Sequence, residues 1–313
     1  MNETDIDLLA IVNRAIRDPV WDARSYSFPK QIETIWPTEA SIIFHENGVR
    51  IVEGACNRAT WYRLKHYKPL GETEDRMHWI WRFGKLLEDD VNLLLKQTGF
   101  LAARNVRFHD NTTSLPISGE MDAIGVMQDH RGEPINFVID VKTTGGNYQG
   151  TTKILGNTKT RPFPKVPNLL QIMIYLNVDP QLKFGKLMYL IRDNLVGNEF
   201  TIRLKDHNGL KIANIKSTVW NSSTSIVGAF GQDYPQYSVE GIYARFQELS
   251  NYYLKNILPP PDYSIEYSEQ RAEDLYRIDR LSDNQITEHR KGKLKGDYQC
   301  IGCKYVEYCK NNK

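Results

Sequence analysis

The chain has 313 residues, enough for one large domain or for a domain with an appendage. Hydrophobic residues make up 41% and charged residues 25%, which excludes wholesale disorder. The formal net charge of +2 gives no bulk preference for nucleic acid, although a local basic groove is compatible with it. The N-terminus lacks an apolar signal segment, and no run reaches the roughly 18 apolar residues of a membrane span. We therefore expect a cytoplasmic protein without a membrane partner, in which disulfides are rare.

Hydrophobic periodicity predicts helices in the first third of the chain at residues 4–17, 55–66 and 74–98. The last of these has a broad apolar face and ends at Gly99. Residues 18–48 are expected to be irregular, since they are aromatic-rich and hold several prolines. Strand-like runs follow at residues 101–109, 115–127 and 134–142, the last of them buried in character.

Residues 145–167 interrupt this pattern with glycines, threonines and prolines, which predicts a long loop. Such loops within compact domains are usually functional. The loop also carries the candidate DNA-binding cations, which are Lys153, Lys159, Arg161 and Lys165. Its aromatics Tyr148 and Phe163 are candidates for stacking on bases.

The second half of the chain predicts a helix at 167–178 and strands at 184–192 and 198–206. Asn208-Gly209 indicates a hairpin turn into a strand at 210–216. A helix is expected at 238–256, ended by the prolines that follow it. The last fifty residues are charged and end in a group of cysteines.

Four cysteines form the strongest local signal. Three make a C-x2-C-x5-C motif near the C-terminus, and the fourth lies far upstream: Cys300, Cys303, Cys309 and Cys56. Four thiolates can complete a zinc site or a [4Fe-4S] cluster. Structural zinc sites more often show two C-x2-C pairs, but the spacing alone leaves both metals open, with reduced unpaired thiols as a third interpretation.

Carboxylates stand at the ends of two successive strand-like runs. Asp122 ends Gly119-Glu-Met-Asp122, and Asp140 begins Asp140-Val-Lys142. Carboxylate oxygens can hold Mg²⁺ or Mn²⁺, and the Val141 carbonyl is available as a further ligand. Lys142 points to the same strand face as Asp140, where it can orient an attacking water or neutralise charge on a phosphate. The alternative is a solvated strand end, which the buried apolar strand before it weakens.

Two helices offer further polar groups. Gln171 and Tyr175 stand at i and i+4, on one face of the helix expected at 167–178. Glu88 lies on the long helix and faces the strands if that helix packs against them; the alternative is a solvated carboxylate in an acidic run. His78, earlier on the same helix, is a fallback metal ligand.

Taken in order, these motifs resemble the PD-(D/E)XK nuclease superfamily, and within it the RecB/AddB-type nucleases with an iron–sulfur cluster, which include the CRISPR adaptation nucleases. The shared order is one cysteine, G-x3-H/E, G-x-x-D, D/E-x-K, Q-x3-Y and C-x2-C-x5-C, and this chain presents all six elements between residues 56 and 309. Two departures are Glu88, where RecB-type helices usually have histidine, and D-x-K in place of the commoner E-x-K. Residues 1–50 and 193–290 match no motif.

The resemblance implies an α/β fold whose restriction-endonuclease-like core is a mixed sheet flanked by helices. This nuclease domain would cover residues 51–313, after an N-terminal extension at 1–50. The implied ligands of one or two Mg²⁺ or Mn²⁺ ions are Glu88, Asp122, Asp140 and Val141. The implied catalytic set adds Lys142, Gln171 and Tyr175. A structural [4Fe-4S] cluster would bind Cys56, Cys300, Cys303 and Cys309 and tie the ends of the domain together.

The expected activity is a metal-dependent exonuclease that acts on single-stranded or tailed DNA. The chain lacks a G-x4-G-K helicase loop, which by analogy suits a stand-alone phage or CRISPR-type enzyme with a recombination, replication or CRISPR partner. Two alternatives remain. One is a non-catalytic DNA-binding or assembly subunit, which the intact Asp122, Asp140 and Lys142 disfavour. The other is a zinc-stabilised structural protein.

Overall fold

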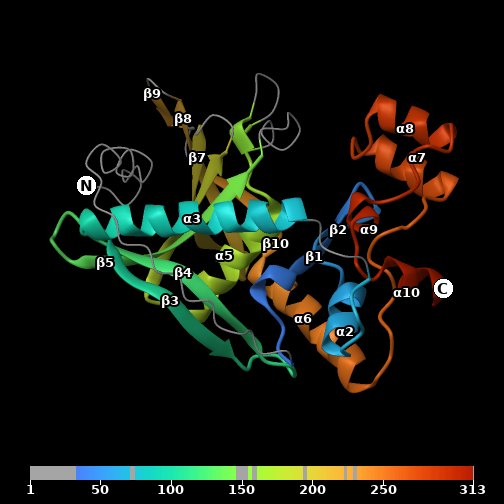
Figure 1. The fold of residues 1–313 in the computed structure, drawn as a ribbon, viewed down its shortest axis with the longest axis horizontal. Coiled ribbons are helices and arrows are strands. Elements are labelled where there is room, and N and C mark those ends of the chain that lie inside the picture. Colours follow the sequence, from blue (N-terminus) through green and yellow to red (C-terminus); the bar gives the residue numbers. More distant parts are fainter. Residues whose placement is uncertain are drawn as a thin grey trace.

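The computed structural model describes residues 33–70, 75–145, 154–156, 161–192, 196–221, 224–227 and 231–312. They form a mixed α/β protein with a mixed sheet flanked by helices, which confirms the expected class (Figure 1). The helix predicted at 4–17 and the cations Lys153 and Lys159 lie outside these residues. No described helix is both long enough and apolar enough to cross a membrane.

The described strands of the main sheet number eight, in the order β10-β8-β7-β6-β5-β4-β3, with β9 paired to β8. Their bounds are β3 (Leu101–Asp110), β4 (Ile117–Gln128), β5 (Pro134–Thr144), β6 (Leu182–Ile191), β7 (Gly197–His207), β8 (Leu210–Asn221), β9 (Thr224–Val227) and β10 (Gln232–Ser238). Within this sheet β5 and β6 form the parallel pair, because a helical crossover connects them. The predicted turn at Asn208-Gly209 is confirmed, whereas β9 and β10 were not predicted.

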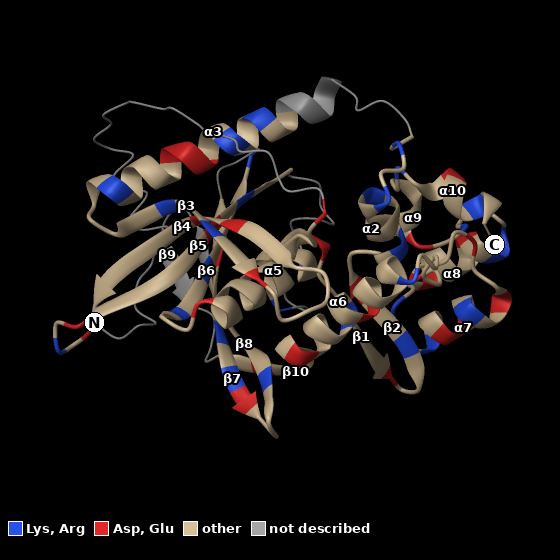
Figure 2. Ribbon diagram, turned by 90° about the horizontal axis from the view of Figure 1, so that it is seen from below, with Lys and Arg blue, Asp and Glu red and all other residues tan. Residues whose placement is uncertain are grey.

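Helices cover both faces of the sheet. On one face α3 (Asp75–Gln97) packs through Leu95 into a cluster that includes Ile139. On the other face α5 (Val166–Val178) packs through Ile172 into a cluster with Val138. Alternate residues of β5 therefore point to opposite helices, so the sheet is the middle of three layers (Figure 2).

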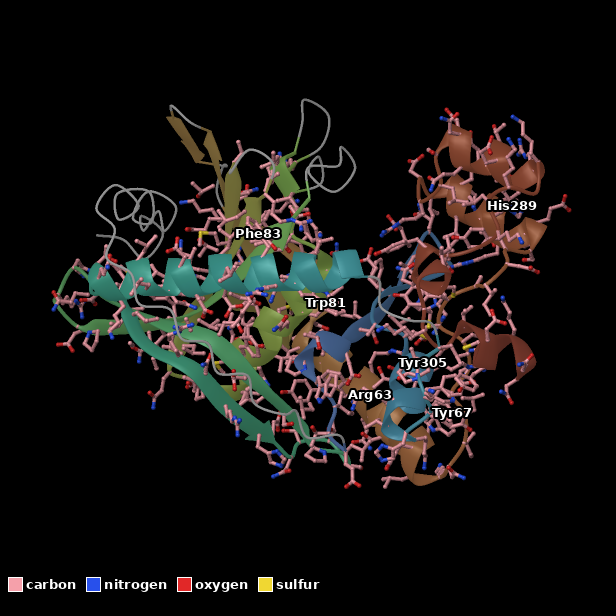
Figure 3. The ribbon with its side chains drawn as sticks, viewed as in Figure 1. Arg63, Tyr67, Trp81, Phe83, His289 and Tyr305 are labelled. Carbon is pink, nitrogen blue, oxygen red and sulfur yellow. The ribbon has the colours of Figure 1, made fainter. Side chains whose placement is uncertain are left out.

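Residues 80–86 of α3 are more exposed than the sequence predicts. Trp81, Phe83 and Leu86 belong to the expected apolar face, yet each side chain is an exposed large hydrophobic group. Trp81 and Phe83 lie on opposite sides of the helix (Figure 3). Among the described side chains of α3, those of the C-terminal half, which include Val91 and Leu95, are buried against the sheet.

A hairpin precedes this core. Strands β1 (Ser41–Glu46) and β2 (Val49–Gly54) pair across Asn47-Gly48, whose φ angles are 49° and 81°. Two residues with positive φ make the tight turn that suits a right-twisted hairpin. The expectation of irregular structure up to residue 48 is therefore wrong for residues 41–48. The expected domain boundary after residue 50 falls inside β2.

The remaining helices gather around this hairpin and the C-terminus (Figure 1). They are η1 (Pro37–Glu39), α2 (Asn57–Leu64), α6 (Val239–Leu254), α7 (Glu269–Arg277), α8 (Asp283–Arg290), α9 (Tyr298–Ile301) and α10 (Val306–Asn311). α2 and α6 confirm predictions, while the four C-terminal helices were not predicted. α7 and α8 pack on the hairpin through an apolar cluster that joins Leu275 and Ile286 to Ile51.

Candidate active site and cysteine cavity

The two aspartates of the acidic motifs lie at the point where β4 and β5 separate. The paired register of these strands extends to Ala123 opposite Ile139. One further step sets Asp122 opposite Asp140, on the sheet face away from Ile139 that α5 covers. Like charges directly opposite in a sheet are destabilising, so this juxtaposition needs a cation to balance it.

Asp140 is fully buried, and neither of its carboxylate oxygens has a hydrogen-bond partner of acceptable geometry within the described residues. The Nζ of Lys142 forms an ion pair with Oδ1 of Asp140 at 2.6 Å and lies 4.0 Å from Oδ2 of Asp122. Buried carboxylate oxygens without hydrogen bonds are costly. They are also the ligand type that Mg²⁺ and Mn²⁺ prefer, so the donor set fits a divalent cation.

Electrostatics link these groups further. Burial raises the pKa of Asp122 well above its ordinary value, the Asp140 and Glu88 charges raise it more, and Lys142 partly offsets them. Burial alone would lower the pKa of Lys142, but Asp140 and Asp122 raise it above its ordinary value. Lys142 therefore remains a cation at neutral pH, whereas Asp122 holds its proton more strongly than an exposed carboxyl group.

Glu88 belongs to the same site. Its Oε1 pairs with Nζ of Lys85 at 2.7 Å, and its charge acts on the pKa of both Asp122 and Lys142. Gly84 explains how α3 approaches the end of β5, since a Cβ at this position would lie 3.1 Å from Oγ1 of Thr143. The side chain of the fallback ligand His78 lies outside the described ones.

Gln171 and Tyr175 position the end of β4. The Gln171 Nε2 donates to the Tyr175 hydroxyl at 2.5 Å, and this hydroxyl donates to the Glu120 carbonyl at 3.0 Å. Both side chains are buried, on the sheet face that also carries Asp140. Because Glu120 precedes Asp122 by two residues, this chain of hydrogen bonds restrains the backbone that carries the aspartate.

The basic loop is described only in part. Arg161 is exposed and donates to Oε1 of Gln232 at 3.2 Å, and Lys165 directly precedes α5. Phe163 packs against Tyr234 with ring centroids 5.0 Å apart, which assigns it to the apolar core instead of a base-stacking surface. Tyr148, Lys153 and Lys159 lie outside the described residues.

All four cysteines line one cavity of ≈ 890 Å³. Burial raises the pKa of Cys56 to about 11, with a further contribution from the charge of Asp262. Burial also raises the pKa of Cys300 to about 12, and the charges of the other three cysteines and Asp297 add to this. The thiols therefore share one electrostatic environment, although Cys56 is distant from the others in sequence.

The four cysteine side chains are not arranged as ligands of a single metal ion. No group of three or more His, Cys, Asp or Glu side chains in the described part of the chain is arranged so that it could hold a metal ion. Four thiolates on zinc would each need a sulfur about 2.3 Å from the metal. The described structure therefore brings the four cysteines to one cavity but does not show them as a set of metal ligands.

Aromatic packing holds the two ends of this cysteine set together. Tyr62 of α2 stacks on Tyr305 with ring centroids 5.7 Å apart, and its ring centroid lies 5.5 Å from that of Tyr308. The Leu70 N–H donates to the Lys304 carbonyl at 2.9 Å. The closure between α2 and the C-terminus therefore includes contacts that involve no metal.

Asp262 was not identified from the sequence. Its Oδ2 accepts from the Asn57 N–H at 2.8 Å and from Nη2 of Arg245 at 2.6 Å. It thereby caps the first turn of α2, directly beside Cys56. An acidic residue after three prolines is a turn signal, and its contact with α2, more than 200 residues away, has no local signature.

Comparison with protein-family models and with curated proteins found no match. A solved structure described as "Crystal structure of SSO0001" aligns with 88% of this chain and 95% of its own, at 14% identity and a TM-score of 0.36. This likeness is too distant to assign a family or an activity.

Proposed function

We propose that this chain is a metal-dependent deoxyribonuclease of the PD-(D/E)XK type. The observation that carries the proposal is the fully buried Asp140 carboxylate, which lies near Asp122 and has the Lys142 ammonium 2.6 Å from its Oδ1. Two neighbouring carboxylates with one lysine leave negative charge that a divalent cation would balance, and carboxylates with a lysine suit metal-assisted phosphodiester hydrolysis. The expected substrate is single-stranded or tailed DNA, attacked from an end.

The residues divide the chemistry among them. Asp122, Asp140, the Val141 carbonyl and Glu88 would hold Mg²⁺ or Mn²⁺, which when bound lowers the pKa of water and polarises phosphate oxygens. Lys142 remains protonated, so it offsets the negative charge that builds on the phosphate instead of removing a proton.

The cavity at Cys56, Cys300, Cys303 and Cys309 supports a [4Fe-4S] cluster as the second part of the proposal. Its role would be structural. The cavity is lined by residues at the start of α2 and from α9 to α10, whereas the aspartates lie on β4 and β5, so the cluster would stabilise the contact between α2 and the C-terminal helices.

Cleavage of labelled single- and double-stranded DNA tests the nuclease. The wild type should cut in the presence of Mn²⁺ or Mg²⁺ and stop in EDTA, and Asp140→Asn should lose activity by several orders of magnitude. Asp206→Asn is the matched control, since this aspartate is exposed at the end of β7. Absence of cleavage by the wild type, or equal cleavage by Asp140→Asn, would contradict the proposal and favour a non-catalytic DNA-binding subunit.

Spectroscopy tests the cluster separately. Anaerobically purified protein should be brown and contain about four iron atoms and four sulfides per chain. Cys303→Ser should lose this absorbance, while Asp140→Asn should keep it. A colourless preparation with one equivalent of zinc would replace the cluster with a zinc site and leave the nuclease proposal untouched.

A further inference from the structure

Two cations converge at the end of β5, and no carboxylate of the described residues pairs with either of them. The Nζ of Lys165 lies 3.4 Å from Oγ1 of Thr144. The Arg192 N–H donates to the Thr144 carbonyl at 3.0 Å, and a Cβ on Gly145 would lie 3.2 Å from Nη2 of Arg192. Both side chains therefore meet at residues 144–145, two residues beyond Lys142.

Neither cation forms an ion pair within the described residues. The Nε of Arg192 is buried there without a hydrogen-bond partner. Burial lowers the pKa of Lys165, and the neighbouring Arg192 charge lowers it further. The segment that carries Lys165 is basic, since residues 141–178 hold five Lys and Arg residues and no Asp or Glu. An anion that binds between the two cations would relieve this repulsion.

The position of the pair indicates which anion. Asp140, Lys142 and Thr144 alternate along β5, so they share the face that α5 covers. Tyr189, next to Lys142 in the β5–β6 register, accepts hydrogen bonds from the Lys165 backbone N–H at 3.0 Å and from Asn168 Nδ2 at 2.8 Å. Thr144 lies roughly 7 Å beyond Lys142 at the rise of a strand. This distance is on the scale of one or two nucleotides, since a stacked strand advances about 3.4 Å per nucleotide along the helix axis.

We propose that Lys165 and Arg192 form a clamp for one backbone phosphate of the DNA strand, one or two nucleotides from the phosphate that is cleaved. This inference rests on the proposed nuclease function and adds to it a binding subsite that fixes the strand's register over Asp122 and Asp140. Arginine supplies a bidentate fork and lysine a point charge, a combination suited to a phosphodiester. The exposure of Lys165 leaves the site open to a long strand.

A binding experiment tests the clamp without requiring cleavage. The protein carries Asp140→Asn, and its affinity for a fluorescent single-stranded oligonucleotide is measured by anisotropy at several salt concentrations. Adding Lys165→Gln and Arg192→Gln should weaken binding roughly tenfold to hundredfold and reduce the salt slope by roughly 0.7, the value for one phosphate of a single strand. Lys183→Gln is the matched control, because Lys183 is exposed near the opposite end of β6.

Oligonucleotides with one neutral methylphosphonate linkage then locate the phosphate. With the clamp intact, neutralisation should weaken binding most at one linkage. In the double variant, neutralising this linkage should no longer weaken binding, while neutralising the other linkages should weaken binding as before. Glutamine at position 165 retains the backbone bond to Tyr189, and thermal unfolding verifies that the variants fold.

The outcomes separate the two proposals. Tight binding by the double variant, or an unchanged methylphosphonate profile, overturns the clamp even if the wild type cleaves DNA. A position-specific profile that depends on Lys165 and Arg192 supports the clamp, even if the wild type cleaves nothing and the nuclease proposal fails.

Discussion

Asp122→Asn separates metal binding from folding, because this carboxyl group is unfavourable in the metal-free protein. Burial raises its pKa, and the Asp140 and Glu88 charges add to the effect. Asparagine keeps the shape of the side chain and removes the charge. We expect the variant to lose the response to Mn²⁺ or Mg²⁺ and to unfold at a higher temperature than the metal-free wild type at alkaline pH.

The sign of the pH dependence follows from linkage. A carboxyl group whose pKa is raised on folding binds its proton more tightly in the folded state. It therefore contributes stability below its unfolded pKa of about 3.9, and this contribution disappears as the pH rises through the folded pKa. The stability gained by Asp122→Asn should thus appear above the raised pKa and vanish well below it. Metal binding must displace the same proton, so metal affinity should rise with pH over that window.

The size of the metal effect can be estimated. A ligand at one hundred times its dissociation constant stabilises the folded state by about 2.7 kcal/mol. For a chain of this length each kcal/mol shifts the midpoint by roughly 2 °C. Saturating metal should therefore raise the unfolding temperature of the wild type by roughly 5 °C.

Thermal unfolding followed by circular dichroism measures this shift at about pH 6 and about pH 9, with EDTA or with Mn²⁺. Asp206→Asn, an exposed strand-end aspartate, should behave as the wild type. A metal shift of equal size in Asp122→Asn, or one of equal size at both pH values, would refute the reasoning.

Three further predictions concern the supports of the two sites. Gly84→Leu should force α3 away from Thr143 Oγ1, which a Cβ would approach to 3.1 Å, and lower kcat more than tenfold while the midpoint of thermal unfolding changes little. Tyr175→Phe should lower the free energy of unfolding in urea by about 1–3 kcal/mol, because the buried Glu120 carbonyl loses its 3.0 Å hydrogen bond; an unchanged value would mean that water replaces the hydroxyl. Cys300→Ser should abolish the visible absorbance of the cluster yet retain far-UV circular dichroism, since aromatic contacts also hold α2 against the C-terminal helices; loss of helix signal would show that the cluster is required for folding.

Local patterns predicted the elements that build the site. The helices at 57–64, 75–97 and 166–178 and the strands that carry Asp122 and Asp140 follow from periodicity, because each buries one face over a long stretch. The Asn-Gly dipeptide at 208–209 predicts the turn that is observed there. The same dipeptide at 47–48 also forms a turn, but it follows a segment rich in prolines and aromatic residues that predicts irregular structure. The C-terminal helices are short and highly charged, so their sequences carry little periodicity to detect.

The order of motifs along the chain determined which groups were candidates: four cysteines, two aspartates, a lysine, a glutamate and the Gln171–Tyr175 pair. Only the tertiary structure decided how they meet. The β4–β5 pairing brings Asp122 near Asp140, a glycine lets the helix of Glu88 approach β5, and the Tyr175 hydroxyl donates to the Glu120 carbonyl near Asp122. The Lys165–Arg192 pair and the Asp262 cap have no sequence signature. Each forms between residues that are far apart in the chain and that only the folded sheet and its connections bring together. The sequence determines which chemical groups are present, because each residue carries its own side chain. Whether a charged group is buried or lacks a partner depends on the tertiary structure, because other parts of the chain surround it.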